Sequence, residues 1–299
     1  KVKFGKGCRL FLIGLAKKVL LANNLGTTFY AVTALPADGI SVATAWLGAI
    51  SYSLMLYFDF GGYSDMAIGL GHMFGFTFPE NFNYPYISRS VSEYWRRWHI
   101  TMSSWFRDYL FYPVLRAKPM TDMARKLKKS GHKEASRNVP TIIALLIVWF
   151  STGLWHGASW NFLLWGVYYA ILLIFEKTVG LKLLKKLPRF VSHIYTVFAF
   201  VMGWALFYFT DMGQLGGFMG RVFTLSATDG KLCNLILAFL PLMAVAIFAA
   251  TPAMKHLHAR YCEKPLVRYG CIAAAAIAMA LCVAALASQS YNPFIYFQF

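Results

Sequence analysis

The stretch VPTIIALLIVWFSTGLWHGASWNFLLWGVYYAILLIF, residues 139–175, decides the fold. It contains two apolar runs, Val139–Trp155 and Trp160–Phe175, each near the ~17–25 residues that a bilayer-spanning helix needs. The short turn between them holds one ionisable residue, His156. This pattern predicts two transmembrane helices joined by a turn, with a histidine at or near membrane depth.

Other apolar runs extend the same pattern along the chain. Four of them are as strong: Val42–Phe58, Val191–Phe209, Leu232–Thr251 and Tyr269–Ser288. Two weaker segments, Leu10–Ala22 and Gly62–Phe78, are interrupted by charged or polar residues, so we expect them to be re-entrant, interfacial or buried in the bundle. We predict an all-α fold, a polytopic transmembrane helical bundle with re-entrant and interfacial amphipathic helices, as one membrane domain over residues 1–299.

Composition and charge support this class. Hydrophobic residues make up 58% of the chain and charged residues 14%, against about 25% in soluble domains. The net charge of +17 lies in short basic blocks between apolar runs, a pattern that orients membrane proteins and attracts anionic lipids rather than nucleic acid. If the basic blocks at 116–138, 177–189 and 255–268 are cytoplasmic, the turn at 155–160 faces the outside or a deep cavity.

The amphipathic segment SRSVSEYWRRWHITMSSWFR, residues 88–107, is expected to form one helix at the membrane interface. One face would hold the apolar residues Val91, Trp95, Trp98, Met102, Trp105 and Phe106. His99 falls at the edge of this face. It is either a functional imidazole or a hydrogen-bonded histidine at a polar–apolar border.

His156 is the sharper candidate, because an ionisable side chain at membrane depth is costly and favours a function. Imidazole is well matched to removing a proton from a hydroxyl near neutral pH. The neighbouring Gly153 and Gly157 leave room for a substrate or another backbone. The alternative is a turn histidine bonded to a nearby carbonyl.

A glycine-rich segment, YFDFGGYSDMAIGLGHMFGF at 57–76, carries Asp59, Ser64 and Asp65 among apolar residues. Its glycines suit close helix packing better than phosphate binding. The two aspartates are substrate contacts or structural counter-ions, and the arginines of residues 89–107 are the partners that we expect. We predict no metal site, because the five cysteines form no CxxC pair and no HExxH motif occurs.

The sequence resembles the bacterial membrane-bound O-acyltransferase (MBOAT) family. The resemblance rests on IGLAKKVLLANNL (13–25), the segments at 57–71 and 74–114, GLWHGASWNFLLWGVY (153–168) and NPFIYFQF (292–299). It implies the MBOAT fold, with His156 as the principal catalytic histidine and His99 as the second. Family members usually have further amino-terminal transmembrane helices, so we expect that the chain, which begins at Lys1, is truncated.

The subgroup that the motifs resemble is the membrane subunit of alginate O-acetyltransferases. This implies transfer of an acetyl group to hydroxyls of a cell-surface polysaccharide, in the bacterial inner membrane. The donor would be a cytoplasmic thioester, acetyl-CoA or an acyl carrier, with no bound cofactor. An SGNH-type acetyltransferase, periplasmic or extracellular, is the expected partner beside membrane lipids. The expected substrate contacts are Trp155, Trp98, Asp59, Ser64, Asp65, Arg96 and Arg97.

Other functions remain open at this point. D-alanyl transfer to teichoic acid is the nearest alternative within the same family. A transporter of polysaccharide or lipid-linked sugar would need ionisable residues along several spans, and the strong spans hold few. A scaffold for a polysaccharide synthase would not need His156.

Overall fold

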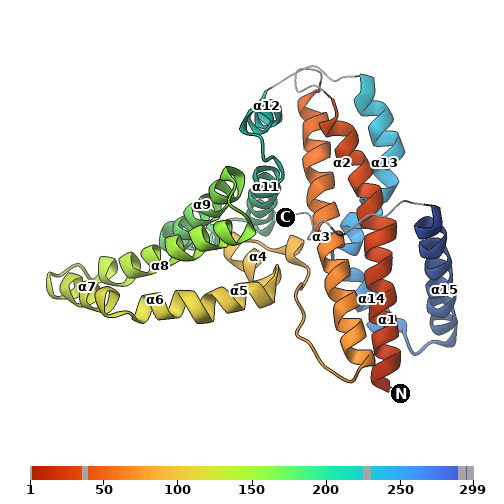
Figure 1. Ribbon diagram of the computed structural model, residues 1–299, viewed down its shortest axis with the longest axis horizontal. Helices are drawn as coiled ribbons and strands as arrows, with labels where there is room; N and C mark the ends of the chain where they lie inside the picture. Colours follow the sequence, from red (N-terminus) through yellow and green to blue (C-terminus); the bar gives the residue numbers. More distant parts are fainter. Residues whose placement is uncertain (1, 36–39, 225–229, 289–293, 295–299) are drawn as a thin grey trace. The chain divides into compact units, whose positions relative to one another are not determined.

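A computed structural model describes residues 2–35, 40–224, 230–288 and 294 of the chain (Figure 1). Its regular elements are all helical, with no strand among the residues described. In that part of the chain, five helices are long and apolar enough to cross a bilayer, or six if one bent pair forms a single span. The predicted all-α, polytopic membrane fold is confirmed.

The described residues group into two compact units. The first contains residues 1–84 and 216–299, and the second contains residues 85–215. The boundary falls within α12 (Met212–Phe223). The expectation of one domain over residues 1–299 stays a prediction.

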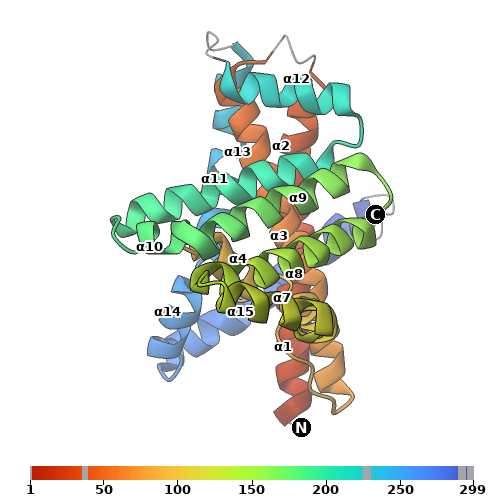
Figure 2. The same cartoon turned by 90° about the vertical axis from the view of Figure 1, so that its left-hand side faces the viewer.

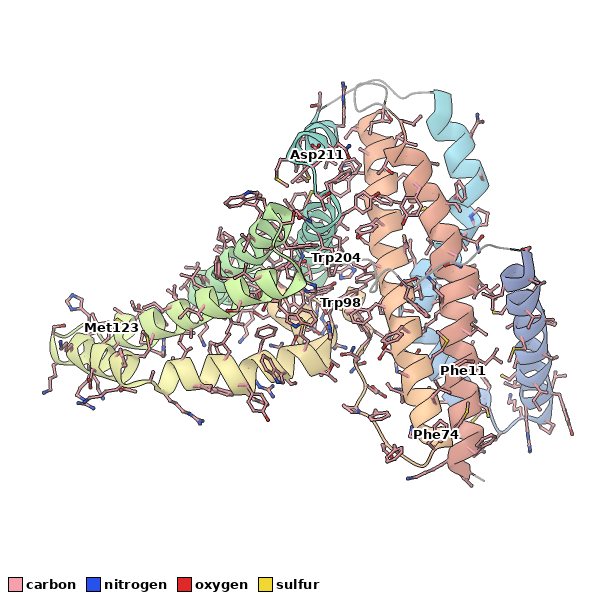
Figure 3. The ribbon with its side chains drawn as sticks, viewed as in Figure 1. Phe11, Phe74, Trp98, Met123, Trp204 and Asp211 are labelled. Carbon is pink, nitrogen blue, oxygen red and sulfur yellow. The ribbon has the colours of Figure 1, made fainter. Side chains whose placement is uncertain are left out.

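In the first unit, two long helical segments run antiparallel. One is formed by α1 (Val2–Ala16), the π-helical η1 (Lys17–Ala22) and α2 (Asn23–Thr33), and the other is α3 (Val42–Met73). Glycines let the two approach, because a Cβ built on Gly14 would lie 2.5 Å from the carbonyl oxygen of Gly62. Phe11, which Figure 3 labels on α1, lies against Gly69 of α3 in the same way.

Of the alternatives expected for the two weaker segments, this packing supports burial in the bundle. Residues 10–22 lie inside a continuous 32-residue span candidate, Val2–Thr33, and residues 62–73 form the second half of α3. Neither is re-entrant. Their polar side chains reduce the apolar signal, but the charged ones pair with each other across the two helices, so both helices continue through them.

The remaining helices of the first unit are α13 (Gly230–Ala249), α14 (Ala253–Tyr261) and α15 (Pro265–Ser288). The predicted spans at 232–251 and 269–288 correspond to α13 and α15. A bend of 66° separates α13 from α14, at the break between Ala249 and Ala253. The closing motif at 292–299 lies outside the described residues, except for Phe294.

Three span-length helices frame the second unit, α8 (Lys133–His156), α9 (Trp160–Phe175) and α11 (Arg189–Tyr208). Figure 2 shows α9 and α11 side by side, and α8 packs along α9. They match the predicted runs at 139–155, 160–175 and 191–209 within a few residues. Beyond Phe175 the chain stays helical through the π-helical η5 (Glu176–Gly180) and α10 (Leu181–Leu184).

The basic block at 116–138 is helical. It folds into α7 (Lys118–Lys129) and the first turns of α8, and the two helices pack together around a tight turn at Ser130–Gly131. The Ser136 hydroxyl donates to the Ala124 carbonyl at 2.8 Å across this hairpin. The basic side chains are exposed: Arg116, Lys118, Arg125, Lys126, Lys128, Lys129, Lys133 and Arg137.

The prediction of a single amphipathic helix over residues 88–107 is wrong. The structure has α4 (Val91–Arg97) and α5 (Ile100–Phe106), followed by the π-helical η4 (Arg107–Phe111) and α6 (Tyr112–Arg116). The break lies at Trp98, which is extended, and His99, whose φ of 45° is left-handed. Four of the six expected apolar residues are buried, whereas Trp105, beyond the break, is 56% exposed.

An aromatic core fills the space between α4, α8, α9 and α11. The ring centroids of Trp95 and Trp149 lie 4.7 Å apart, and those of Trp95 and Tyr169 lie 4.9 Å apart. Trp98 packs against Trp204 of α11 at 4.8 Å (Figure 3). The chain leaves the helical path after α4 because Trp98 enters this core.

Candidate functional site

His156 is the last residue of α8, and the turn after it requires glycine. Gly157 has a φ of 153°, a conformation that residues with a side chain rarely adopt. A Cβ at this position would also lie 2.8 Å from the ring of Phe162. The backbone therefore reverses directly after the imidazole and enters α9.

Aromatic rings from α9 and α11 surround the His156 imidazole. Its centroid lies 5.1 Å from both Trp165 and Phe207, which meet it edge-on. Behind these rings, the Asn161 amide donates to the Phe207 carbonyl at 2.7 Å, and Asn161 is fully buried. This bond fixes the start of α9 against the end of α11, so three helices hold the turn that carries His156.

His99 reaches the same place from a different element. It is 8% exposed and lies between α4 and α5. The ring of Trp155 contacts both histidines, with its centroid 6.4 Å from the His99 centroid and 4.8 Å from that of His156. Two imidazoles separated by 57 positions in the sequence are thus brought to one aromatic ring.

The surroundings keep His99 neutral. Burial and, to a smaller extent, the nearby His156 lower the pKa of His99 to about 3. At neutral pH the ring therefore has one N–H donor and one acceptor nitrogen. A neutral imidazole can donate a hydrogen bond to a developing negative charge without carrying a charge itself.

The other residues expected to contact substrate in this unit have different surroundings. Trp155 is 50% exposed beside the two histidines, whereas Trp98 is 3% exposed in the aromatic core. Arg96 is exposed, and Arg97 pairs with Glu93 one turn earlier at 3.0 Å. Trp155 is therefore the residue of this group that the structure places against the histidines.

The aspartates of the glycine-rich segment lie on α3 in the first unit. Asp59 forms an ion pair with Lys18, with both side chains almost completely buried, and Asp65 pairs with Lys17 at 2.6 Å. The arginine partners that we expected are thus replaced by lysines of η1. Ser64, between them, is buried on α3. The paired aspartates have the geometry of counter-ions.

No cluster of three or more histidine, cysteine, aspartate or glutamate side chains suited to a metal occurs in the described part of the chain. His193, near the start of α11, forms a hydrogen bond between two segments of the second unit. Its Nδ1 lies 3.0 Å from the Ser88 carbonyl oxygen, to which it donates. It thereby ties α11 to the segment that leads into α4.

The sequence did not predict that Glu176 is buried. Glu176 is 0% exposed and accepts hydrogen bonds from the backbone N–H groups of Val91 at 2.6 Å and Ser92 at 2.8 Å. In the sequence it follows an apolar run and precedes Lys177, so it resembles the first residue of a basic loop. The only signal was its place directly after Phe175, one residue from a predicted span.

Comparison with known proteins identifies the family. Residues 5–125 match the model of the membrane-bound O-acyltransferase family. A probable alginate O-acetylase of Pseudomonas putida is 33% identical over 99% of this chain and 61% of its own length. A peptidoglycan O-acetyltransferase of Helicobacter pylori is 34% identical over 67% of this chain and 35% of its own length.

A teichoic acid D-alanyltransferase of Bacillus subtilis is also similar, with 32% identity over 57% of this chain and 42% of that protein. The chain spans about three fifths of the length of the alginate O-acetylases that it matches. The near-complete coverage of this chain at one-third identity is decisive. The chain belongs to the membrane-bound O-acyltransferase family.

Proposed function

We propose that the protein transfers an acetyl group from a thioester donor to hydroxyl groups of a cell-surface polysaccharide. The observation that carries this proposal is the convergence of His99 and His156 on the ring of Trp155. Family membership and the names of the relatives from Pseudomonas putida and Helicobacter pylori support the reaction class.

His156 acts as the general base in this proposal. Its neutral imidazole takes the proton of the acceptor hydroxyl, and the oxygen attacks the thioester carbonyl carbon. The carbon–sulfur bond then breaks and the donor leaves as a thiolate, which takes the proton from His156 and becomes a thiol. General base catalysis of this kind contributes about 10²–10⁴-fold in rate.

His99 orients the acyl carbonyl or donates a hydrogen bond to the oxyanion that forms on it. Its neutral state supports this role, because a buried charged ring would have to be desolvated. Trp155, half exposed beside both rings, contacts the substrate. For Trp98, Asp59 and Asp65 we propose a supporting role through packing and ion pairing, and Ser64, Arg96 and Arg97 remain candidate substrate contacts.

Charge and family support the proposed donor and partner. Coenzyme A and acyl carriers are acidic, and the exposed basic residues of α7 and its flanks would attract them from the cytoplasm. We propose that the protein resides in the bacterial inner membrane among lipids. The acceptor is the sugar hydroxyl itself or a serine of an SGNH-type acetyltransferase on the outer face.

The test is complementation of a deletion strain with the full-length protein, with polysaccharide-linked acetate as the readout. We expect His156→Ala to remove the acetate and His99→Asn to reduce it strongly at equal membrane abundance. Asparagine is chosen because it tolerates the left-handed backbone at position 99. His256→Ala, at an exposed position on α14, is the matched control and should behave as wild type.

Normal acetate with His156→Ala would overturn the catalytic assignment in favour of a scaffold or transporter. The D-alanyl alternative is supported by the similarity to the Bacillus subtilis protein. It is separated by feeding labelled acetate and labelled D-alanine in parallel. Label from D-alanine alone, dependent on His156, would assign the alternative reaction.

A further inference from the structure

The helix that precedes His99, α4, is short, and side chains outside it accept hydrogen bonds from the backbone of its first turn. α4 has seven residues, too few to be stable alone in water. Its first N–H groups would be orphaned without external acceptors. The Ser90 hydroxyl accepts from the Glu93 N–H at 3.0 Å, and the Glu176 carboxylate accepts from Val91 and Ser92 with one oxygen each.

Glu176 is an unusual group to find in this place. It is completely buried, it lies in the span candidate Trp160–Leu184, and it is 85 positions from Val91 in the sequence. A buried carboxylate within a span is costly unless hydrogen bonds compensate for lost water. The two N–H donors and the positive end of the α4 dipole supply that compensation.

Further contacts hold α4 to α11. The Trp204 indole N–H donates to the Tyr94 hydroxyl at 3.2 Å, and His193 donates to the Ser88 carbonyl. Among these hydrogen-bonded anchors, Glu176 alone comes from the helical segment that starts at the His156 turn, and Trp95 of α4 also packs on Tyr169 of the same segment. α9 begins four residues after His156 and runs without a break into η5.

This arrangement links the two histidines through one continuous helical segment. α9 begins directly after the turn that carries His156. Glu176 follows the last residue of α9 and accepts hydrogen bonds from the start of α4. α4 in turn ends at the Trp98–His99 break. The bonds between Glu176 and α4 therefore act together with the aromatic packing of Trp95 and Trp98 in setting the position of His99 relative to His156.

We infer that Glu176 is a positioning residue for His99, acting through α4 without touching substrate. This inference rests on the proposed function only in the experiment that measures acetyl transfer. A displacement of about 1 Å at a reacting group can cost about 10²-fold in rate. Glu176→Gln keeps the size of the side chain but places an N–H₂ group opposite one of the two backbone donors. Glu176→Asp keeps the charge with a shorter reach.

The first experiment measures position without turnover. The purified full-length protein is treated with diethyl pyrocarbonate, and modification of each histidine is quantified by mass spectrometry. His99 should be protected in the wild type and at least about fivefold more reactive in Glu176→Gln, because a shifted α4 exposes a ring that is now 8% accessible. The exposed His132, on the α7–α8 turn, is the internal reference and should not change.

The second experiment measures the kinetic consequence. We expect Glu176→Gln to lower kcat for acetyl transfer about 10–100-fold with the donor KM within about twofold, and Glu176→Asp to recover part of it. Thr196→Val, which removes an equally buried hydroxyl of α11 bonded only within its own helix, is the control. If Glu176→Gln fails to fold, Ser90→Ala weakens the same end of α4 and should act in the same direction.

Unchanged protection of His99 in every variant that loosens α4 would overturn the inference. So would a lower unfolding temperature combined with wild-type kcat, because that result assigns Glu176 to stability alone. If His99 becomes reactive but transfer does not depend on His156 in the parallel His156→Ala sample, the proposed function fails and the positioning role stands.

Discussion

His99 combines a strained backbone with a buried, titratable ring. A non-glycine residue with a φ of 45° is uncommon and marks a site where the surroundings impose the conformation. Here Trp98, drawn into the aromatic core, and the short α5 that starts at Ile100 fix both neighbours of the residue. The strain is therefore maintained by packing on both sides of His99, next to the proposed catalytic base.

The lowered pKa of His99 predicts a pH dependence of stability. The unfolded chain takes up a proton at this ring as the pH falls below about 6.5, whereas the folded protein takes it up only near pH 3. Acid therefore favours the unfolded state, and the stability present above pH 6.5 declines as the pH falls toward 3. His99 lies between α4 and α5, outside the span candidates.

The measurement is thermal unfolding in detergent at pH 7.5 and pH 5. We expect wild type to lose more stability between these values than His99→Asn, which lacks the titrating ring. His156 is present in both proteins and cancels in the comparison. Equal losses in the two proteins would show that His99 titrates alike when folded and unfolded.

Two π-helical turns place buried charges inside otherwise apolar helices. η1 carries Lys18 and η5 begins with Glu176. A π-helical turn inserts an extra residue and is frequent at functional sites. It changes the face on which the following side chains lie. In both segments the charge meets a partner on another element, Asp59 in one case and the start of α4 in the other.

The Lys18–Asp59 pair predicts a strongly asymmetric mutational response. Lys18→Met leaves a buried carboxylate without its lysine, which costs about 3–5 kcal/mol in comparable pairs. The double variant Lys18→Met, Asp59→Leu replaces both charges by apolar groups and should recover most of that loss. Both variants are compared by unfolding temperature in one detergent.

An exposed pair provides the control for this cycle. Arg125 and Asp122 lie one turn apart on α7 at 3.4 Å, with most of the arginine in solvent. Surface pairs contribute little, so Arg125→Met should leave the unfolding temperature nearly unchanged. A double variant that is no more stable than Lys18→Met would mean that the pair is stabilised by more than its charges.

At the scale of the whole molecule, the distribution of basic residues predicts the orientation of the second unit. α8 has 24 residues, about 36 Å at 1.5 Å per residue, which exceeds the ~30 Å hydrocarbon thickness. Its first turn follows the basic α7 hairpin, and its last residue is His156. The two ends of α8 should therefore lie on opposite sides of the membrane, with the basic end in the cytoplasm.

Single-cysteine labelling tests this orientation. The native cysteines are replaced by serine, and one cysteine is introduced as Ser130→Cys before α8 or as Ala158→Cys after it, both at exposed positions. We expect a membrane-impermeant maleimide added to intact cells to label position 158, and to label position 130 only after permeabilisation. The reverse pattern would place the basic hairpin outside.

Much of the architecture was determined by local composition. The runs at 139–155, 160–175 and 191–209 appear as helices close to the predicted ends, because a bilayer-length apolar run has one helical solution for its backbone hydrogen bonds. His156 was found for a related reason. It is an ionisable residue between two such runs, and no neighbour in the sequence is needed to recognise it.

Other features were decided by contacts between distant residues. The break at His99 depends on Trp98 entering a core built from α8, α9 and α11, so the periodicity of residues 88–107 predicted an unbroken helix. The lysine partners of Asp59 and Asp65, and the Glu176 bonds to α4, join positions 41, 48 and 85 residues apart. The sequence alone shows that a buried charge needs a partner. Only the tertiary structure determines which residue that partner is, because hydrogen bonds and ion pairs form between groups that folding brings within a few ångströms.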